Sequence, residues 1–363
     1  MPKRMAWDRW LFLTVAFLVL GGLSMVVSAS SYRAVIQGKS PAHYLFVQLF
    51  HALTGAVAFA CTVRLPYARL ADRRVITWGL AGIFVALIVV MLMPAAGGAH
   101  RWFRLGPLAV QPSELARILA IVFLADLLAQ RESEVNDPVR VLRPAAAVVG
   151  GLAVAIVIEP DLGSAVLLSA TALAMIFVAG LRFKYLGWAA ATGIAGLIGA
   201  VLIQPYRVQR VMTFLHPGGD TRATGFQLNQ SLIAVGNGGL TGTGWGQGQQ
   251  KAFYLPAAHT DFIFSVIGEE LGLLGTLVIL LAFIILFWRG MRTAVRAPDR
   301  FGFYLALGIT CMLVLQGFIH MGVCLGLLPT KGLPLPFVSY GGSSLVASLA
   351  ATGILLNVSQ HSN

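Results

Sequence analysis

The sequence predicts an all-α polytopic membrane protein. Of its 363 residues, 57% are hydrophobic and only 11% are charged, whereas a soluble domain carries about a quarter charged residues. The mean hydropathy is +0.80. The apolar residues are gathered in long runs, each of the length that an α-helix needs to cross about 30 Å of hydrocarbon. These observations exclude an ordinary soluble protein and predict one membrane domain over residues 1–363.

About ten apolar runs of membrane-spanning length follow one another along the chain. They cover residues 11–30, 45–63, 76–96, 114–130, 143–159, 162–180, 184–204, 262–288, 302–326 and 341–358. Only Glu159, Pro160 and Asp161 separate the fifth run from the sixth. Proline lacks an amide donor and disfavours helix in the residue before it. We therefore expect a tight hairpin at this point rather than one long helix.

The basic residues indicate how the helices are oriented. With the N-terminus in the cytoplasm, sixteen of the 26 Lys and Arg residues fall in cytoplasmic loops and nine in outer loops, as the positive-inside rule requires. We expect both termini in the cytoplasm and a long extracytoplasmic loop, about residues 205–261, between spans seven and eight. Most of the formal charge of +12 is this bias, so no nucleic-acid partner is expected. The nine outer charges suit an anionic lipid headgroup or a phosphorylated substrate.

The first polar cluster lies in the second outer loop and at the start of the fourth span. Arg101 and Arg104 share one face if the piece Ala99–Gly106 forms a short interfacial helix. Glu114 and Arg117 are three residues apart, hence on one helix face. Charges in a membrane helix are costly, so pairing is expected. The sequence leaves open whether the pair is internal or contacts a substrate.

Two carboxylates, Glu159 and Asp161, mark the outer hairpin between spans five and six. They suit an outward site for a divalent cation, Mg or Mn, or for a substrate sugar. The alternative is a solvated turn that caps the sixth helix. The functional interpretation is favoured because a turn needs only one of the two acids.

The long outer loop ends at His259, Thr260 and Asp261, where the eighth span begins. An aspartate at a membrane boundary is partly desolvated, which raises its pKa and suits a general base, while neighbouring arginines oppose that shift. From the residues alone, Asp261 serves equally well as a helix cap. The glycines of this loop fit neither a dinucleotide-binding fingerprint nor a P-loop, so no nucleotide site is predicted.

Three further charged residues lie in the eighth span and the last outer loop. Glu269 and Glu270 stand two turns into the span, where at least one must face protein or water. Lys331 lies in a proline-rich stretch that stiffens the last outer loop. Its ammonium is therefore expected to be held beside the mouth of the bundle.

Six motifs resemble the SEDS family of bacterial membrane proteins (shape, elongation, division and sporulation), and its FtsW members more than its RodA members. The motifs are Gln111–Arg117 (QPSELAR), Glu159–Gly163 (EPDLG), Gln230–Gly236 (QSLIAVG), His259–Phe264 (HTDFIF), Ile267–Gly272 (IGEELG) and Thr330–Ser344 (TKGLPLPFVSYGGSS). They occur in the family's order and the resemblance covers essentially the whole chain. Two positions depart from the family pattern. Ala257 stands where many members have Glu, and Arg117 replaces the usual Lys.

The resemblance implies a peptidoglycan glycosyltransferase of the bacterial cytoplasmic (inner) membrane. Such an enzyme polymerises lipid II on the outer face and releases undecaprenyl pyrophosphate, here in cell division. The implied partners are a class B penicillin-binding protein, which is a transpeptidase, and other divisome or elongasome membrane proteins. By motif, Asp261 corresponds to the family's essential aspartate, and we expect it to take the proton of the acceptor hydroxyl.

The other expected site residues surround this aspartate, and the basic ones would hold the pyrophosphate. The expected substrate-binding residues are Arg207, Arg210, His259, Thr260, Lys331, Lys251, Arg101 and Ser339, with Glu114, Arg117 and Glu270 in supporting roles and Glu159 and Asp161 as cation ligands. Two alternatives remain. A flippase for lipid II would be favoured by charges deep in the membrane, and a non-enzymatic divisome scaffold that activates a transpeptidase would tolerate replacement of Asp261.

Overall fold

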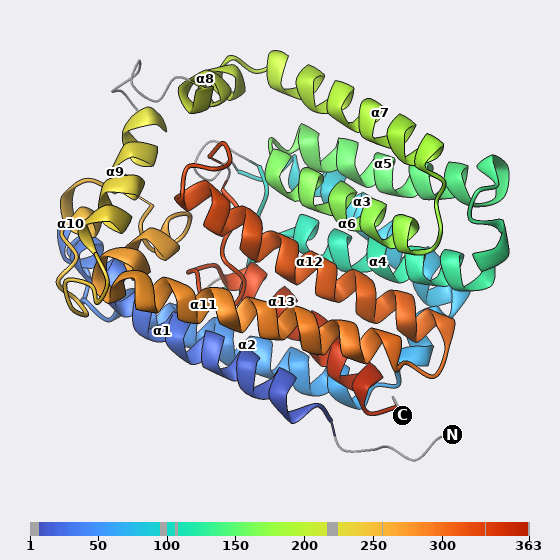
Figure 1. Cartoon of the computed structure of the whole chain (residues 1–363), viewed down its shortest axis with the longest axis horizontal. Coiled ribbons are helices and arrows are strands. Elements are labelled where there is room, and N and C mark those ends of the chain that lie inside the picture. Colours follow the sequence, from blue (N-terminus) through green and yellow to red (C-terminus); the bar gives the residue numbers. More distant parts are fainter. Residues whose placement is uncertain are drawn as a thin grey trace.

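The computed structural model describes residues 7–94, 100–105, 108–215, 224–255, 257–330 and 332–361, and these form a bundle of long helices (Figure 1). Each of the ten apolar runs coincides with one helix. These are α1 (Arg9–Ile36), α2 (His43–Arg64), α3 (Arg73–Val90), α4 (Pro112–Gln130), α5 (Arg143–Ile158), α6 (Leu162–Val178), α7 (Phe183–Leu202), α11 (Ile263–Val295), α12 (Arg300–Cys324) and α13 (Gly342–Ser359). Eight helices in the described chain are long and apolar enough to cross a membrane. The all-α polytopic prediction is confirmed.

Shorter elements fill the connections between the long helices. They are η1 (Tyr67–Ala71), η2 (Glu132–Glu134), the π-helix η3 (Pro138–Leu142), α8 (Pro205–Leu215), α9 (Thr224–Asn237) and α10 (Gln250–Phe253). The long outer loop is therefore largely helical. Its helices α8, α9 and α10 lie together at one end of the bundle (Figure 1).

The segment 101–105 is not the short helix that its arginine spacing suggested. Strand β1 (Phe103–Leu105) pairs antiparallel with β2 (Leu108–Val110). The Arg101 side chain donates to the backbone carbonyls of Glu159 and Pro160, with Nε 2.8 Å from the Glu159 oxygen. These long-range bonds and the strand pairing hold the segment extended, and they outweigh the local spacing.

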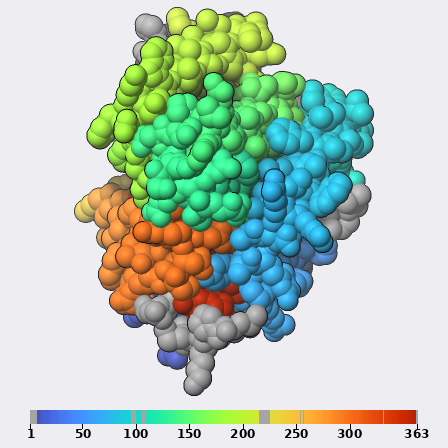
Figure 2. Space-filling model, turned by 90° about the vertical axis from the view of Figure 1, so that its right-hand side faces the viewer, coloured from blue at the N-terminus to red at the C-terminus, as the bar shows by residue number. Residues whose placement is uncertain are grey.

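Hydrogen bonds place the start of α1 and the end of α13 at the same end of the bundle, here called the terminal end. The backbone N–H of Asp8 donates to Ser359 Oγ at 3.3 Å, and the Asp8 carboxylate pairs with Arg289 of α11 at 2.5 Å. Figure 2 looks onto this end, where residues around 131–142 (green) and around the α11–α12 turn (orange) form much of the surface. The opposite end, where α1 ends and α11 begins, is the site end. Both ends of the chain therefore lie at one end of the bundle, as the expected topology requires. That this end faces the cytoplasm stays a prediction.

The core of the bundle is built on α12 and α13. Most of α12 and α13 is buried. In the most apolar 18-residue stretch of each helix, 72% of the residues of α12 and 78% of those of α13 are buried, against 6% for α7. The α7 helix runs along one side of the bundle (Figure 1). Its side chains are apolar but not covered by protein, which is typical of a helix that faces lipid.

The turn between α5 and α6 is as tight as the proline predicted. Helix α5 ends at Ile158 and α6 begins at Leu162, with the Asp161 carboxylate accepting the N–H of Ser164 at 3.1 Å. Glu159 is only 1% exposed and Asp161 only 6%. The turn does cap the sixth helix, but it is not the solvated turn of the alternative interpretation.

A break in α11 receives the polar loop that follows α9. Gly272 has φ +65 and interrupts the helix, which leaves the carbonyls of Glu269 and Glu270 without helical partners. The N–H groups of Thr243 and Gly244 occupy them at 2.9 and 3.0 Å. The loop is thereby joined to α11 through backbone bonds that do not depend on its side chains.

The side-chain carboxylates of Glu269 and Glu270 also accept hydrogen bonds from this loop. Glu269 accepts the N–H groups of Gln249 and Gln250 at 2.8 and 3.1 Å, and Glu270 accepts that of Gly246 at 3.0 Å. Both glutamates are buried, at 1% and 0% exposed. The expectation that at least one faces protein is met by both.

Gly242 tests how firmly this loop is held. It has φ +84, and a Cβ there would overlap the backbone of Glu270. We expect Gly242→Ala to lower the free energy of unfolding by about 2 kcal/mol, because both the backbone conformation and the contact would be strained. Gly236→Ala is the matched control, since its Cβ would meet nothing within 4 Å. Tryptophan-monitored unfolding in detergent would measure both, and equal midpoints would show that the loop is not fixed.

Candidate active site

Asp261 lies in a tight turn that leads into α11. The N–H groups of Thr260 and Asp261 both donate to the carbonyl of Ala257, at 3.2 and 3.1 Å. Phe262 is the N-cap residue of α11, and no side chain caps this helix. Asp261 is therefore not used as a helix cap, and its expected role as a general base stays a prediction.

Burial dominates the electrostatics of Asp261. It raises the pKa of the carboxyl to about 6, against the opposing charges of Arg210 and Arg101. Such a carboxyl is ionised at neutral pH, yet it accepts a proton more readily than an exposed aspartate. A pKa raised by burial and opposed by arginines is what the sequence led us to expect at this position.

Among the described residues, Arg210 and Arg101 are the two cations that lower the pKa of Asp261. The Arg210 guanidinium lies 4.4 Å from the centre of the Tyr206 ring, and its Nη1 donates to the carbonyl of Thr330 at 3.1 Å. Arg101 is fixed by the turn between α5 and α6, as described above. The carboxylate thus lies close to two positive groups that come from different parts of the chain.

Arg207 adds a third positive group near Arg101. Its guanidinium donates to the carbonyls of Ala200 at 2.7 Å and Val157 at 3.2 Å. Burial, and then the nearby charge of Arg101, lower its pKa. No carboxylate in the described chain forms an ion pair with any of these three arginines. Their charges therefore remain available for an anionic ligand.

The last outer loop approaches Asp261 from another direction. A Cβ added at Gly332 would lie 3.5 Å from Asp261 Oδ2, so the Gly332 backbone lies next to the carboxylate. Lys331, expected to bind substrate, lies outside the described residues. Its role stays a prediction, supported by the position of its neighbour.

Ser339 and Tyr340 fix the turn that carries Asp261. The Ser339 hydroxyl donates to the Thr260 carbonyl at 2.7 Å and accepts the Leu335 N–H at 2.8 Å. The Tyr340 N–H donates to the His259 carbonyl at 2.9 Å. The Ser339 hydroxyl therefore joins the two segments, and the prediction that it contacts substrate is untested.

His259 belongs to a group of three packed rings. Its ring lies 5.1 Å from that of Tyr44 and 5.5 Å from that of Tyr340, and the two tyrosine rings are 5.3 Å apart. The side chain is 5% exposed. Burial, and then the charge of Arg33, lower the pKa of His259 to about 4. The imidazole is neutral at physiological pH and lends the turn rigidity rather than charge.

The two acids of the α5–α6 turn have unequal surroundings. Asp161 Oδ2 accepts the Gln111 amide at 2.9 Å and the Ser113 hydroxyl at 3.3 Å. Neither carboxylate oxygen of Glu159 has a hydrogen-bond partner in the described chain. Burial, and then the charge of Asp161, raise the pKa of Glu159 to about 8, with Arg101 opposing. A buried carboxyl without donors fits a place where a cation would be bound.

Motifs from distant parts of the chain thus meet at the site end of the bundle. The sequence was also compared with protein families and with solved structures. The family model described as "Cell cycle protein", which covers FtsW, RodA and SpoVE, matches residues 8–363. The chain belongs to this FtsW/RodA/SpoVE family.

Similar proteins and structures agree with this membership. Stage V sporulation protein E of Bacillus subtilis (strain 168) is 40% identical, over 99% of each chain. A probable peptidoglycan glycosyltransferase FtsW of Geobacter metallireducens is 41% identical, over 97% of this chain and 94% of the relative. Thermus thermophilus RodA superposes with a TM-score of 0.72 at 28% identity, over 98% and 97% of the two chains. A chain in a peptidoglycan synthase complex that coordinates polymerisation and crosslinking matches with a TM-score of 0.78 at 28% identity, over 98% of each chain.

In this FtsW/RodA/SpoVE protein, Glu114 and Arg117 form the buried ion pair that their spacing suggested. The two side chains are 6% and 2% exposed. Arg117 also donates to Gln316 Oε1 at 2.7 Å, and the Gln316 amide donates to the Pro334 carbonyl at 2.8 Å. The pair is therefore connected to the last outer loop, which supports a positioning role for it.

Sequence reasoning missed three buried polar side chains that hold this loop. Gln316 is one of them. Gln48 donates to the Ser339 carbonyl at 3.2 Å, and His320 Nδ1 lies 2.8 Å from the Leu333 carbonyl oxygen. Each of the three is 1% exposed. An isolated polar residue in an apolar membrane helix needs a partner, and that signal would have indicated them.

Lys251 lies in a different environment from the one expected for a substrate ligand. Its ammonium forms an ion pair with Glu270 and donates to Ser28 Oγ at 2.7 Å. Its side chain is 6% exposed. In this arrangement Lys251 links α10 to α1 and α11. The supporting role expected for Glu270 stays a prediction, and this ion pair is in its favour. Direct contact of Lys251 with substrate stays a prediction.

Proposed function

We propose that the chain is a peptidoglycan glycosyltransferase that polymerises lipid II on the outer face of the bacterial cytoplasmic membrane during cell division. Relatives about 40% identical over nearly the whole chain are named probable peptidoglycan glycosyltransferase FtsW. One observation carries the mechanism. The Asp261 carboxylate is partly buried, does not cap a helix and is close to Arg210 and Arg101, neither of which forms an ion pair with a carboxylate among the described residues.

Asp261 is the proposed general base. The acceptor sugar hydroxyl attacks the anomeric carbon of the donor sugar, forming the new glycosidic C–O bond. Its proton passes to the Asp261 carboxylate, and the bond between the anomeric carbon and the pyrophosphate oxygen breaks. The electron pair leaves with the lipid pyrophosphate, so negative charge develops there.

The arginines are placed to stabilise that charge. Arg210 and Arg101 are near enough to Asp261 to influence its pKa, and Arg207 is near Arg101. Planar guanidinium groups form paired hydrogen bonds with phosphate oxygens. Donors fixed before the reaction stabilise a developing oxyanion without further reorganisation. Lys331 is the fourth proposed donor, on the strength of its sequence position.

Glu159 and Asp161 would hold a divalent cation, Mg or Mn. Two carboxylates and the oxygens of a substrate phosphate are a common ligand set for Mg²⁺. No third His, Cys, Asp or Glu joins them among the described residues, so substrate and water would complete the coordination. When bound, the cation would neutralise charge on the pyrophosphate.

A cation-binding measurement tests this assignment. Titration of the purified protein with Mn²⁺, followed by electron paramagnetic resonance, should give an affinity at least about tenfold lower for Glu159→Gln, because an anionic ligand is lost. Glu134→Gln is the control, since Glu134 is a half-buried acid at the terminal end, where it pairs with Arg140. Equal affinity of the wild type and Glu159→Gln would remove Glu159 from the site.

The proposed activity is tested with the purified chain, a class B penicillin-binding protein, lipid II and a divalent cation. A structural relative belongs to a complex that coordinates polymerisation and crosslinking, which supports this choice of partner. Gel separation should show long glycan strands. Transfer of lipid II across liposomes without any polymer would instead support a flippase. An effect on the partner's crosslinking alone would support a scaffold.

A further inference from the structure

A loop beside the candidate active site borders a polar hollow that takes no part in the steps proposed above. The loop, residues 238–249, follows α9 and leads into α10 at the site end of the bundle (Figure 1). The hollow has a volume of about 580 Å³, within the range of small-ligand sites. We call it the loop hollow, defined by Asn237, Thr243, Gln247, Gln249 and Glu269.

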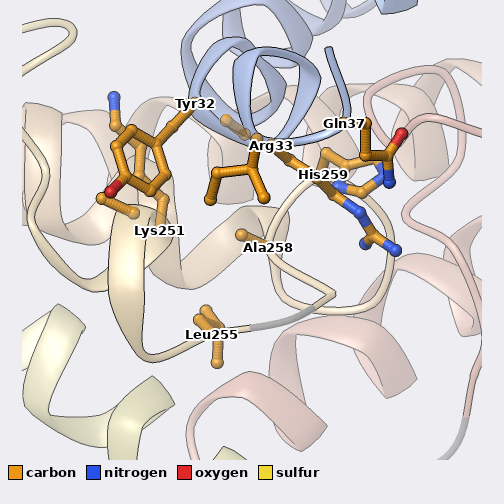
Figure 3. A pocket seen from close by; sticks show the side chains of 10 residues that line it. Tyr32, Arg33, Gln37, Lys251, Leu255, Ala258 and His259 are labelled. Carbon is orange, nitrogen blue, oxygen red and sulfur yellow. The ribbon is translucent and has the colours of Figure 1, made fainter. Parts of the chain in front are cut away.

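The loop is held in place along its length and at its end. Its backbone N–H groups bond to carbonyls and carboxylates of Glu269 and Glu270, as described above. Lys251, just after the loop, pairs with Glu270 and donates to Ser28 Oγ at 2.7 Å. Figure 3 shows Lys251 and Tyr32 of α1 lining a neighbouring hollow. The side chains of the loop therefore project from a rigid frame, which lowers the entropic cost of binding a ligand.

The lining of the loop hollow offers uncharged hydrogen-bonding groups. The side chains of Asn237, Gln247 and Gln249 are exposed and form no hydrogen bond with another described residue. Each of these amides can both donate and accept. The Thr243 hydroxyl donates to the Glu269 carbonyl at 3.1 Å, so its oxygen can also accept. A ligand with several hydroxyl or amide groups matches this lining.

The charge at the loop hollow disfavours anions. Among the described residues that line it, Glu269 alone carries a charge. Its carboxylate accepts N–H groups of the loop and is 1% exposed. A pyrophosphate or an acidic lipid headgroup would lie beside this carboxylate without a cation, which is unfavourable.

The size of the loop hollow also argues against a metal ion as its ligand. A cation with a shell of six waters, at about 30 Å³ each, would fill only about a third of the volume. A sugar unit, which is larger and carries hydroxyl groups around its ring, uses more of the space and more of the amides. The loop hollow therefore fits a neutral sugar better than an ion.

An exposed indole lies in the same loop. Trp245, between the lining residues Thr243 and Gln247 in the sequence, is 54% exposed. Aromatic side chains of this kind offer a large and rigid apolar contact area. A sugar ring has hydroxyl groups on its edge and C–H groups on its faces. It can therefore bond to the amides of the loop and also cover an apolar ring.

The loop hollow lies near the level at which α11 enters the membrane. The helix has 33 residues and is about 50 Å long, more than the hydrocarbon thickness of about 30 Å. Its residues up to Glu270 are buried, and its exposed leucines begin at Leu271. From Ile263, beside the turn of Asp261, the helix rises about 9 Å to Glu269. A glycan strand that ends at Asp261 would therefore have further sugar units within reach of the hollow.

We infer that the loop hollow binds sugar units of the glycan strand through the amides of Asn237, Gln247 and Gln249. This inference rests on the proposed function, because it assigns a second contact to the polymer of the same reaction. A strand held here stays bound between transfers, so more sugars are added before it dissociates. The loop hollow thus determines the length of the strands rather than the rate of each transfer.

A binding measurement on the full chain in nanodiscs tests the site itself. The probe is tetra-N-acetylchitotetraose, a soluble oligosaccharide of N-acetylated sugars, titrated by calorimetry. Gln247→Ala and Gln249→Ala should each bind it about threefold to tenfold more weakly than the wild type, the effect of one lost hydrogen bond. Thr241→Ala is the matched control, because Thr241 is exposed in the same loop and does not line the hollow. The backbone bonds of the loop do not involve these side chains, so all three variants should fold.

Two binding results would overturn the inference. One is a wild type that does not bind the oligosaccharide, and the other is equal affinity of the wild type and both glutamine variants. Binding of Mn²⁺ that is weakened in the glutamine variants, without oligosaccharide binding, would also overturn it and make the hollow a cation site.

Strand length separates this inference from the proposed function. With lipid II and the partner transpeptidase, the double variant Gln247→Ala with Gln249→Ala should make shorter strands at an unchanged initial rate of lipid II consumption. Strands of wild-type length would contradict the inference and leave the glycosyltransferase intact. Oligosaccharide binding that depends on the two glutamines, in samples that form no polymer, would support the sugar site and contradict the glycosyltransferase.

Discussion

Replacement of Asp261 with Asn should lower kcat for glycan polymerisation by about a hundredfold to ten-thousandfold, the range that a general base contributes. Asparagine is nearly isosteric with aspartate but does not accept the proton of the acceptor hydroxyl. Because no side chain caps α11, this change should leave the fold and the affinity for lipid II almost unchanged. Gel analysis of glycan strands and a binding measurement would separate the two effects.

The pH profile offers a second readout for the same residue. The pKa of Asp261 is raised to about 6 by burial, and only the ionised form is a base. For the wild type, kcat/KM should therefore fall about tenfold for each pH unit below 6 and level off above it. The matched control is Asp72→Asn, an exposed N-cap of α3 that Asn replaces well. Activity of Asp261→Asn close to that of this control would exclude the proposed base.

Replacement of Arg117 with Met should destabilise the protein by about 3–5 kcal/mol, because it leaves the Glu114 carboxylate buried without its partner. The Glu114–Arg117 pair lies inside the bundle, with side chains 6% and 2% exposed. The bond from Arg117 to Gln316, and so the connection to the last outer loop, would be lost as well. Unfolding midpoints in detergent, together with polymerisation rates, would show both consequences.

Two further variants separate charge from geometry at this pair. Arg117→Lys keeps the charge and loses the guanidinium bond to Gln316, so it should cost only about 1 kcal/mol. The double variant Glu114→Gln with Arg117→Met removes both charges and should recover much of the stability that Arg117→Met loses. A double variant as unstable as Arg117→Met would show that packing, not the unpaired carboxylate, determines the loss.

The membrane helices were predictable from the sequence because each depends on its own composition. An apolar run of sufficient length forms a helix in lipid whatever its neighbours are. The tight α5–α6 turn followed from Pro160 in the same local way. The candidate base was indicated by its position at the end of a polar segment and by the family motif.

The remainder of the site depends on contacts between distant parts of the chain. Arg101 is extended rather than helical because it bonds to a turn 58 residues away. Lys251 is paired with Glu270, which is 19 residues away and on another element. Gln48 reaches a carbonyl 291 residues away. Local spacing carries no information on such partners, so these roles became visible only in three dimensions.

The hydrogen bond between the Asp8 N–H and Ser359 Oγ shows that the first and last helices meet, so the order of the helices along the chain could be changed by circular permutation. The start of α1 and the end of α13 are close enough for a short linker to join them, as chain ends in many domains are. New ends could be opened between Pro138 and Arg140, which are exposed residues of the connection at the same end of the bundle (Figure 2). A circularly permuted chain of this kind would keep every spanning helix in its original orientation across the membrane. It would present its new ends beside α4 and α5 for the attachment of a label or a second protein.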